Sequence, residues 1–341
     1  MHKHKQSQCK RKVKHRKNVM GLIIFCITVC IVFMFAYYQN LRKEISVRQE
    51  WLETVLTREK KWILENQGPE GEIYMNGSKA GDVNPYFACM AALGLLAETK
   101  NCPMTETEQK AVGRYLDWHT GVLLETDGKM GIYRKEGGEL IYKEKADSED
   151  GYLGMYLFLM GKYLEKTEST DLPESWKNGI SLALKKIQSL MQDGITQVSE
   201  ENTTVYLMDN LEVWKGLYEL ELAGLEDTQA ISEIRKKIQK QIEKIFWDDA
   251  NQRWRIIGNS DRYHQTEFYP DGVAQIYPLI YEFPVKEKKK QKVLYDQFTE
   301  RFQWQKLNKK RTGFLWAMTG MAAAQMRDIN NLAVSYTHLT L

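Results

Sequence analysis

Acidic residues interrupt an otherwise apolar stretch at residues 207–217, which reads LMDNLEVWKGL. Asp209, Asn210 and Glu212 stand within four positions of one another there. A carboxyl group that keeps its proton can act as a general acid, and an ionised carboxylate near it can act as a general base. The types and spacing of these residues therefore indicate acid–base chemistry, provided that further carboxylates lie close to them in space.

Three other apolar stretches also begin with acidic or amide residues. They are DVNPYF with Asp82 and Asn84, KADSEDGYLG with Asp147, Glu149 and Asp150, and FYPDGVAQ with Asp271. Helix capping is one explanation, because an Asp or Asn at an N-cap accepts hydrogen bonds from free backbone N–H groups. Asp209 with Glu212 fits a capping box. Capping does not explain why two of the clusters hold more acids than a cap needs.

Aromatic side chains gather near the same positions. They are Tyr74, Tyr86, Tyr133, Tyr152, Tyr206, Trp214, Phe268 and Tyr269. Packing in an apolar core is one role for such rings. The other role is stacking against the C–H faces of sugar rings, whose hydroxyl groups need acceptors such as carboxylates. On this second interpretation the expected substrate contacts are Asp82, Asn84, Tyr86, Tyr152, Asn210, Trp214 and Tyr269.

The elements that must position these residues are helices of two kinds. One kind is apolar on nearly every side, which predicts burial; these helices are expected at 86–97, 151–164, 211–225, 273–283 and 313–326. The other kind is amphipathic, as in the three-four spacing of Ile231, Ile234, Ile238 and Ile242. The two kinds alternate, and the buried helices start about every sixty residues. This pattern predicts an all-α domain in which an inner ring of helices is wrapped by an outer ring.

The topology of such a double ring brings the acidic residues together. Short connections make successive helices antiparallel, so all inner helices run in one direction and their N-termini gather at one end. The loops that enter the inner helices contain Gly turns followed by β-favouring residues, as in TDGKMGIYRKEGG. Loops held by a rigid scaffold often carry function. We therefore expect one shared cavity at that end.

The alternation over residues 51–333 resembles the six-hairpin, (α/α)6-toroid glycosidases, particularly the inverting branch that cuts β-linked glucan- and chitosan-type chains. KADSEDGYLGMYLFL is similar to the Asp-rich start of the central inner helix of that branch. YLMDNLEVWKGL and FYPDGVAQIYPL resemble inner-helix starts of membrane-anchored members. The resemblance implies an (α/α)6 toroid of inner and outer helices and a polysaccharide or oligosaccharide substrate.

The resemblance also implies catalytic roles. In that branch an early Glu protonates the leaving oxygen, a middle Asp holds the distorted sugar and a later Asp activates water. Asp147 or Asp150 matches the middle role, and Asp209 or Asp271 the later one. DVNPYF offers no Glu at the early position, so Glu72 could serve only if its loop folds inward. The candidate catalytic residues are Asp147, Asp150, Asp209, Glu212, Asp271 and Glu72.

Paired-carboxylate hydrolysis makes a physical demand on these groups. An inverting enzyme needs one protonated and one ionised carboxyl group, roughly 6.5–9.5 Å apart with water between them. Crowding several carboxylates around a cleft raises the pKa of at least one of them through repulsion between like charges. We therefore expect a raised pKa among the candidates.

The N-terminus predicts a membrane anchor. Residues 1–18 contain eight Lys and Arg and no acid, and residues 19–38 contain no charged residue. About twenty apolar residues suffice for a helix to cross a bilayer, and the basic flank favours a cytoplasmic N-terminus. A cleaved signal peptide is the alternative, but FMFAYYQNLRKE offers a poor cleavage site. We expect a single-pass cell-membrane protein with its main domain outside the membrane.

The remaining boundaries follow from these assignments. We expect a stalk and a first outer helix at residues 39–66 and the helical barrel at 67–333. Residues 334–341 lie in VSYTHLTL, which breaks the helical pattern and resembles translated adaptor sequence. A toroid of six hairpins has twelve helices, and the sequence predicts about ten. Truncation near residue 333 would account for both observations.

Composition excludes other classes of protein. The chain has a net charge of +3, but after residue 18 it has 40 basic and 45 acidic residues. This part lacks the basic footprint of a nucleic-acid-binding protein. No CxxC or HExxH pattern is present, so we expect no metal and no cofactor.

Two alternative functions stay open. One is a non-catalytic glycan-binding or exopolysaccharide assembly factor on the same fold, which the missing early Glu favours. The other is a polysaccharide lyase that uses His119 or His264, although acidic helix starts would repel a uronate substrate.

Overall fold

The computed structural model describes residues 34, 37–43, 45–47, 49–77, 81–137, 139–169, 171–225, 228–260, 267–285, 288–304 and 316–331. The chain divides into two compact units, of which the smaller contains residues 1–59 with 99–102. Within this unit, residues 49–59 are helical, and the Glu53 carboxylate accepts a hydrogen bond of 2.8 Å from the Asn101 side chain.

The predicted membrane span at residues 19–38 lies mostly outside the described residues, as does the predicted non-native tail at 334–341. Among the helices that are described, none combines the length and the apolar character needed to span a bilayer.

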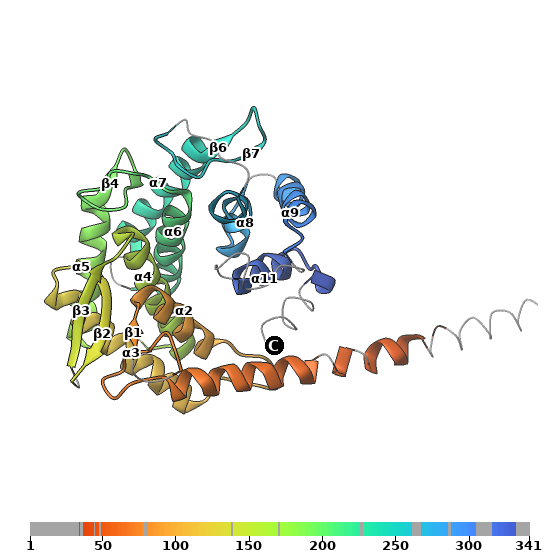
Figure 1. Ribbon diagram of the computed structural model, residues 1–341, viewed down its shortest axis with the longest axis horizontal. Helices are drawn as coiled ribbons and strands as arrows, with labels where there is room; N and C mark the ends of the chain where they lie inside the picture. Colours follow the sequence, from red (N-terminus) through yellow and green to blue (C-terminus); the bar gives the residue numbers. More distant parts are fainter. Residues whose placement is uncertain are drawn as a thin grey trace, which may run out of the picture. The chain divides into compact units, whose positions relative to one another are not determined.

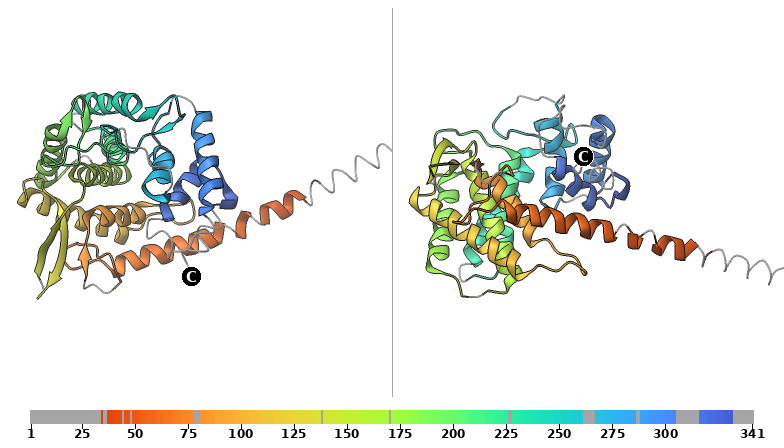
Figure 2. Two further views of the ribbon diagram at one scale, coloured as in Figure 1. Left: turned by 45° about the horizontal axis from the view of Figure 1, so that its top comes forward. Right: turned by 60° about the horizontal axis from the view of Figure 1, so that its bottom comes forward.

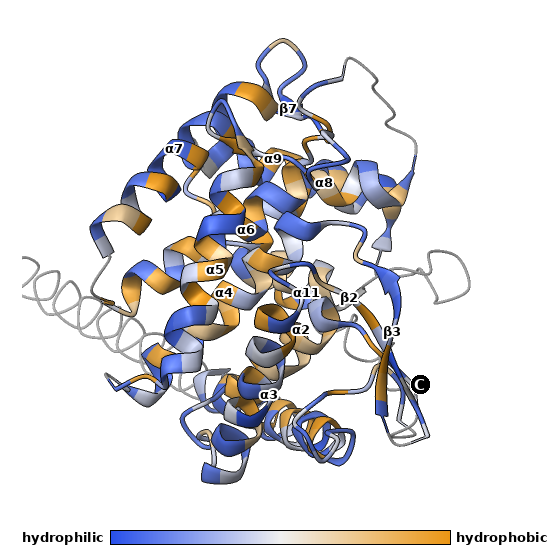
Figure 3. Cartoon of the chain, turned by 90° about the vertical axis from the view of Figure 1, so that its left-hand side faces the viewer, coloured by the Kyte–Doolittle hydropathy of each residue, from blue (hydrophilic) through white to orange (hydrophobic). Residues whose placement is uncertain are grey.

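The larger unit, residues 60–98 with 103–341, alternates buried and amphipathic helices as predicted (Figure 1). The inner helices are α2 (Pro85–Leu96), α4 (Glu149–Thr167), α6 (Leu207–Leu222), α8 (Val273–Ile280) and α11 (Trp316–Gln325). The outer helices are α3 (Glu106–Glu125), α5 (Glu174–Leu190), α7 (Thr228–Phe246) and α9 (Lys288–Phe302). Figure 3 shows orange patches interrupting the blue of α7, the pattern of a helix with one exposed face.

The inner helices pack side by side in chain order. Helix α4 contacts α2 and α6, and α8 contacts α6 and α11, while α3, α7 and α9 pack on α2, α6 and α8. Helices α4 and α6 approach most closely through glycine. A Cβ atom at Gly154 of α4 would lie 2.6 Å from the Val213 backbone nitrogen of α6, which is shorter than a van der Waals contact. The absence of a side chain therefore sets the spacing of these two helices.

Short β-hairpins precede three of the inner helices. Strands β1 (Asp82–Val83), β2 (Gly131–Glu136) and β3 (Glu139–Lys145) form an antiparallel sheet before α4. Figure 2 shows β2 and β3 as a long two-stranded ribbon (yellow). Strands β4 (Met191–Gln192) and β5 (Ile195–Thr196) precede α6, and β6 (Trp247–Asp248) and β7 (Arg253–Trp254) precede α8. The β2–β3 and β4–β5 hairpins lie in the Gly-containing, β-favouring loops that the sequence predicts, whereas the β6–β7 hairpin, WDDANQRW, contains no Gly and was not predicted.

Candidate active site

A cavity of about 110 Å³ lies at the N-terminal ends of inner helices α2, α4 and α6. A five-residue turn before α8, η1 (Phe268–Gly272), also contributes to it. The lining residues are Asn84, Tyr86, Phe87, Asp147, Ser148, Tyr152, Met208, Asp209, Glu212, Tyr269 and Tyr277. Side chains that are far apart in the sequence therefore meet in one space, which we call the acidic cavity.

Capping does not occupy the acids of α6. The N-cap of this helix is Tyr206, and no side chain makes a capping hydrogen bond there. Asp209 and Glu212 are consequently available to the cavity. Capping does explain Asn84, because its side chain accepts hydrogen bonds from the backbone N–H groups of Tyr86 and Phe87 at the start of α2. Of the two roles that the sequence left open, capping therefore applies to Asn84, and a role in the cavity applies to Asp209 and Glu212.

Glu212 is held by three tyrosine hydroxyl groups. Its Oε1 accepts hydrogen bonds from Tyr277 at 2.8 Å and Tyr281 at 3.2 Å, and also from Tyr86. The side chain is buried, and this burial raises the pKa of the Glu212 carboxyl group to about 8, although the tyrosine hydrogen bonds oppose the rise. At neutral pH Glu212 is therefore a carboxylic acid with a proton to donate.

Asp209 also favours its protonated form. Its Oδ2 atom is buried and has no hydrogen-bond partner in the described part of the chain. Burial raises the pKa of Asp209 well above its usual value, and the nearby charges of Asp150 and Glu212 raise it further. Asp209 thus places a carboxyl oxygen that has no hydrogen-bond partner within the described residues at the wall of the cavity.

Asp150 lies behind the cavity rather than in it. The side chain is fully buried and accepts hydrogen bonds from the hydroxyls of Ser148 at 2.8 Å and Thr196 at 2.7 Å. Burial raises the pKa of Asp150 to about 6, against the lowering effect of these bonds. Thr196 is also fixed by Asn210, whose amide hydrogen bonds with its backbone at 2.9 Å. Asp150 and Asn210 therefore fix β5 against the starts of α4 and α6.

Asp147 and Tyr269 are the exposed members of the cavity. Asp147 presents its carboxylate to solvent at the start of α4. Tyr269 is 42% exposed, and its pKa is raised to about 12 by burial and by the charges of Asp209, Glu212 and Asp147. Tyr269 consequently lies within electrostatic range of all three carboxyl groups of the cavity.

Known structures share this fold. A glycosidase matches with a TM-score of 0.58 and 12% identity, over 85% of this chain and 82% of that chain. A glycosidase variant in complex with glucose gives the same values. A rhamnosidase from Klebsiella oxytoca with rhamnose bound matches with a TM-score of 0.51 and 11% identity, over 80% of this chain and 53% of that chain. No family model and no curated protein matches the sequence.

The chain has the fold of the six-hairpin glycosidases. Both the predicted all-α double ring and the resemblance to that fold are thereby confirmed. At 11–12% identity the likeness concerns the fold, so the chemistry of this chain has to be argued from its own cavity.

Three of the candidate catalytic residues do not line the acidic cavity. Asp150 is the buried support described above. Asp271 lines a neighbouring pocket, because η1 directs Tyr269 to one cavity and Asp271 to the other. Glu72 is fully buried in its own loop, where it accepts hydrogen bonds from the Tyr74 hydroxyl at 2.7 Å and the Glu70 backbone at 3.0 Å. The loop of Glu72 does not bring it to the cavity.

Three candidate substrate contacts also lie elsewhere. Asp82 forms ion pairs with Arg134 and Lys143 at 2.7 Å each, and the hydrogen bond from Arg134 is the main cause that lowers the pKa of Asp82 to about 2. Trp214 is buried and stacks on Tyr218 with ring centroids 5.4 Å apart. The Asn210 side-chain amide forms hydrogen bonds with the Thr196 backbone. These residues stabilise the scaffold and leave Asn84, Tyr86, Tyr152 and Tyr269 at the cavity.

The sequence interpretation missed the tyrosines of α8. Tyr277 and Tyr281 stand four residues apart, so they share a face of the helix that ends between them, and both reach Glu212. The four-residue spacing of these two tyrosines can be read in the sequence of residues 273–283, VAQIYPLIYEF. Phe87, Ser148 and Met208 also line the cavity, and each neighbours a predicted residue.

The two histidines considered for a lyase do not contribute to the described site. His119 is fully buried beside Cys89 and Tyr115, and burial lowers its pKa to about 3. His264 lies outside the described residues. Among the residues that the structure describes, no group of three His, Cys, Asp or Glu side chains is placed to hold a metal ion.

Proposed function

We propose that this chain is a glycoside hydrolase that cleaves a polysaccharide with a pair of carboxyl groups. The observation that carries the proposal is the pairing of a proton-retaining Glu212 with the exposed carboxylate of Asp147 in one cavity. The glycosidase fold supports it independently. The acids and tyrosines of the cavity suit the hydroxyl groups and the C–H faces of a sugar.

Each residue takes a role that its surroundings favour. Glu212 donates its proton to the glycosidic oxygen as the bond to the anomeric carbon breaks. Asp147 takes a proton from the water that attacks that carbon from the opposite face, so the product has an inverted configuration. Asp209 binds a substrate hydroxyl group through its unpartnered Oδ2 atom. Tyr269 supplies a flat face for the sugar ring.

The test uses the full-length chain with β-glucans, chitosan and other polysaccharides, and measures release of reducing ends. We expect Glu212→Gln and Asp147→Asn to lower kcat/KM by about a thousandfold or more, since each removes a group that moves a proton. Asp82→Asn is the matched control, because Asp82 lies in an ion pair outside the cavity. NMR of the first product anomer distinguishes inversion from retention.

The same assay separates the alternative functions. Glycan binding that Tyr269→Ala weakens, without release of reducing ends by the wild type, would instead identify a non-catalytic binding or assembly factor. Products with an unsaturated terminal sugar would identify a lyase. The missing Glu in DVNPYF favours a binding factor, and the proton-retaining Glu212 in the cavity is the observation that favours hydrolysis over it.

We further propose that residues 19–38 anchor the protein in the cell membrane, with the main domain outside. The basic residues before this apolar segment support that orientation. Membrane fractionation followed by protease treatment of intact cells tests it. The strain must have an outer envelope that admits the protease. Resistance of the main domain to the protease in such cells would contradict the proposal. Recovery of the uncleaved chain in the soluble fraction would also contradict it.

A further inference from the structure

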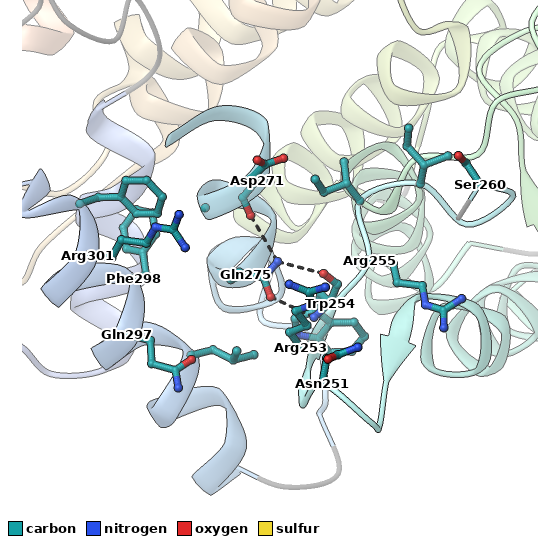
Figure 4. A pocket seen from close by; sticks show the side chains of 15 residues that line it. Asn251, Arg253, Trp254, Arg255, Ser260, Asp271, Gln275, Gln297, Phe298 and Arg301 are labelled. Atoms are coloured by element: carbon teal, nitrogen blue, oxygen red, sulfur yellow. Dashed lines mark hydrogen bonds between the residues drawn. The ribbon is translucent and has the colours of Figure 1, made fainter. Parts of the chain in front are cut away.

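A second cavity adjoins the acidic one through the turn η1. It has a volume of about 250 Å³. Tyr269 of η1 lines the acidic cavity, whereas Asp271 and Gly272 of the same turn line the second. Three arginines, Arg253, Arg255 and Arg301, line this space, and we call it the arginine pocket. Figure 4 shows Arg253 and Arg301 near Gln275 and Asp271, whereas the Arg255 side chain points away from them. The two neighbouring cavities therefore differ sharply in charge.

The pocket has a firmly held floor. The Gln275 side chain of α8 hydrogen bonds with the Trp254 backbone in both directions, each bond 2.9 Å long, and also with the Asp271 carbonyl oxygen at 3.2 Å (Figure 4). These bonds join β7 to the start of α8. Trp254 is 2% exposed, and its indole N–H is buried without a hydrogen-bond partner in the described part of the chain. Such a floor is preorganised for a ligand.

The charges of the pocket select the kind of ligand. Among the described residues that line it are three arginines and one aspartate, Asp271. Asp248 approaches Arg255 at 3.9 Å and offsets part of one positive charge. A guanidinium group binds a carboxylate with two parallel hydrogen bonds. The presence of Asp271 favours a ligand with one negative charge over a doubly charged phosphate monoester.

The other lining groups favour a sugar as the carrier of that charge. Asn251 and Gln297 offer amide groups that can both donate to and accept from hydroxyl groups. Ile256 and Ile257, both half-buried, provide apolar surface beside them. A carboxylate, several hydroxyl groups and apolar C–H faces occur together in a uronic acid.

We infer that the arginine pocket binds a carboxylate-bearing sugar residue of a chain whose adjacent, uncharged unit enters the acidic cavity. This inference rests on the proposed function and narrows its substrate to an acidic polysaccharide. The exposed Asp147 carboxylate disfavours a uronate in the acidic cavity, so the two charge patterns also fix the register in which such a chain binds.

The experiment measures binding by calorimetry, with the full-length chain carrying Glu212→Gln so that no turnover is needed. The probes are an oligosaccharide of alternating glucuronic acid and glucose and a glucose oligosaccharide of equal length. We expect the charged probe to bind about tenfold more tightly, with an advantage that shrinks as salt is added. Equal affinities would overturn the inference, while hydrolysis of neutral glycans could still stand.

Substitutions identify the pocket. Arg301→Gln and Arg253→Gln should each weaken binding of the charged probe about tenfold and leave the glucose probe unchanged. Arg301 is exposed on α9, so its variant is expected to fold, and a melting curve checks both variants. The matched control is Arg134→Gln, which removes a guanidinium group from β2. Equal effects of Arg301→Gln and Arg134→Gln would contradict the assignment.

A competition arm separates a sugar site from a general anion site. Free glucuronate should displace the charged probe, and inorganic phosphate at the same concentration should not. Displacement by phosphate as effective as by glucuronate would overturn the assignment to a sugar.

Discussion

Glu212 shows how one carboxyl group balances opposing influences. Burial removes water that would stabilise its charged form, whereas hydroxyl donors stabilise that form directly. Burial dominates here, because the pKa of Glu212 rises to about 8 although three tyrosines donate to one oxygen. The tyrosines therefore hold the group in place and limit the rise.

Removing one of these donors should shift the pH dependence of the reaction. Tyr277→Phe deletes a hydrogen bond that lowers the pKa of Glu212, so that pKa should rise. The activity of a general acid is lost when it ionises, so the alkaline limb of kcat/KM should move to higher pH. Measuring kcat/KM against pH tests this.

The control for that experiment is Tyr295→Phe, because the Tyr295 hydroxyl donates to Asp328 and does not line the acidic cavity. Its pH profile should match that of the wild type. An alkaline limb that stays in place, or moves to lower pH, in Tyr277→Phe would argue against Glu212 as the proton donor.

Tyr269 tests the role of aromatic stacking. Tyr269→Ala removes the exposed ring at the cavity and should raise KM about fivefold or more, since a ring contact contributes on the order of 1 kcal/mol. Tyr269→Phe keeps the ring and should change KM little. Steady-state kinetics on both variants test this. An equal rise in KM above the wild-type value for both variants would show that the hydroxyl group, not the ring, contributes to binding.

The sequence indicated the right class of residue but not each residue's place. Asp209 lies in the first turn of α6 and Asp271 lies just before α8, yet only Asp209 lines the acidic cavity. The difference depends on η1, whose backbone turns Asp271 toward the arginine pocket, and no helical periodicity reports such a turn. Similarly, the internal bonds of Glu72 with Tyr74 and Glu70 are set by loop folding.

At the scale of elements, close contact between α4 and α6 holds the acidic residues in register. Asp150 lies in the first turn of α4, Asp209 in the first turn of α6 and Glu212 in the second turn of α6. Gly154 lies against the backbone of Val213, so the two helices cannot shift without a clash or a gap. Helix periodicity predicted both helices, but the closeness of their contact depends on packing across the chain.

A methyl group at this contact should be costly. Gly154→Ala places a Cβ 2.6 Å from the Val213 nitrogen, and overpacking of this kind destabilises a protein by about 1–3 kcal/mol. Gly121→Ala is the matched control, because nothing lies within 4 Å of a Cβ there on α3. That variant should be stabilised by about 0.5–1 kcal/mol. Denaturant unfolding of both variants checks the opposite signs, and two shifts of the same sign would contradict the packing argument.

At the scale of the whole molecule, the larger unit gathers buried acids by repetition. Each repeat of inner and outer helix returns the chain to the same end, so residues about sixty positions apart meet there. The sequence could predict this convergence because it follows from alternating helix direction. It could not predict the depth of each acid, which depends on the surrounding side chains.

The depth of these acids gives the folded protein a characteristic pH dependence. The pKa is raised to about 6 for Asp150 and about 8 for Glu212, and it is also raised for Asp209. Between its unfolded and folded pKa, each group binds more protons in the folded state than in the unfolded chain. The free energy of unfolding therefore falls as pH rises through this window. The slope approaches about 1.4 kcal/mol per pH unit for each such group.

We expect this fall to be measurable by denaturant unfolding from about pH 5 to about pH 8, and to be shallower in Glu212→Gln, which cannot ionise. The variant should therefore gain stability relative to the wild type as pH rises. Asp82→Asn is the control, because the pKa of Asp82 is lowered to about 2 and its contribution is constant over this range. Parallel curves for Glu212→Gln and the wild type would mean that Glu212 is ionised throughout, and the proton donor would then have to be sought in Asp209.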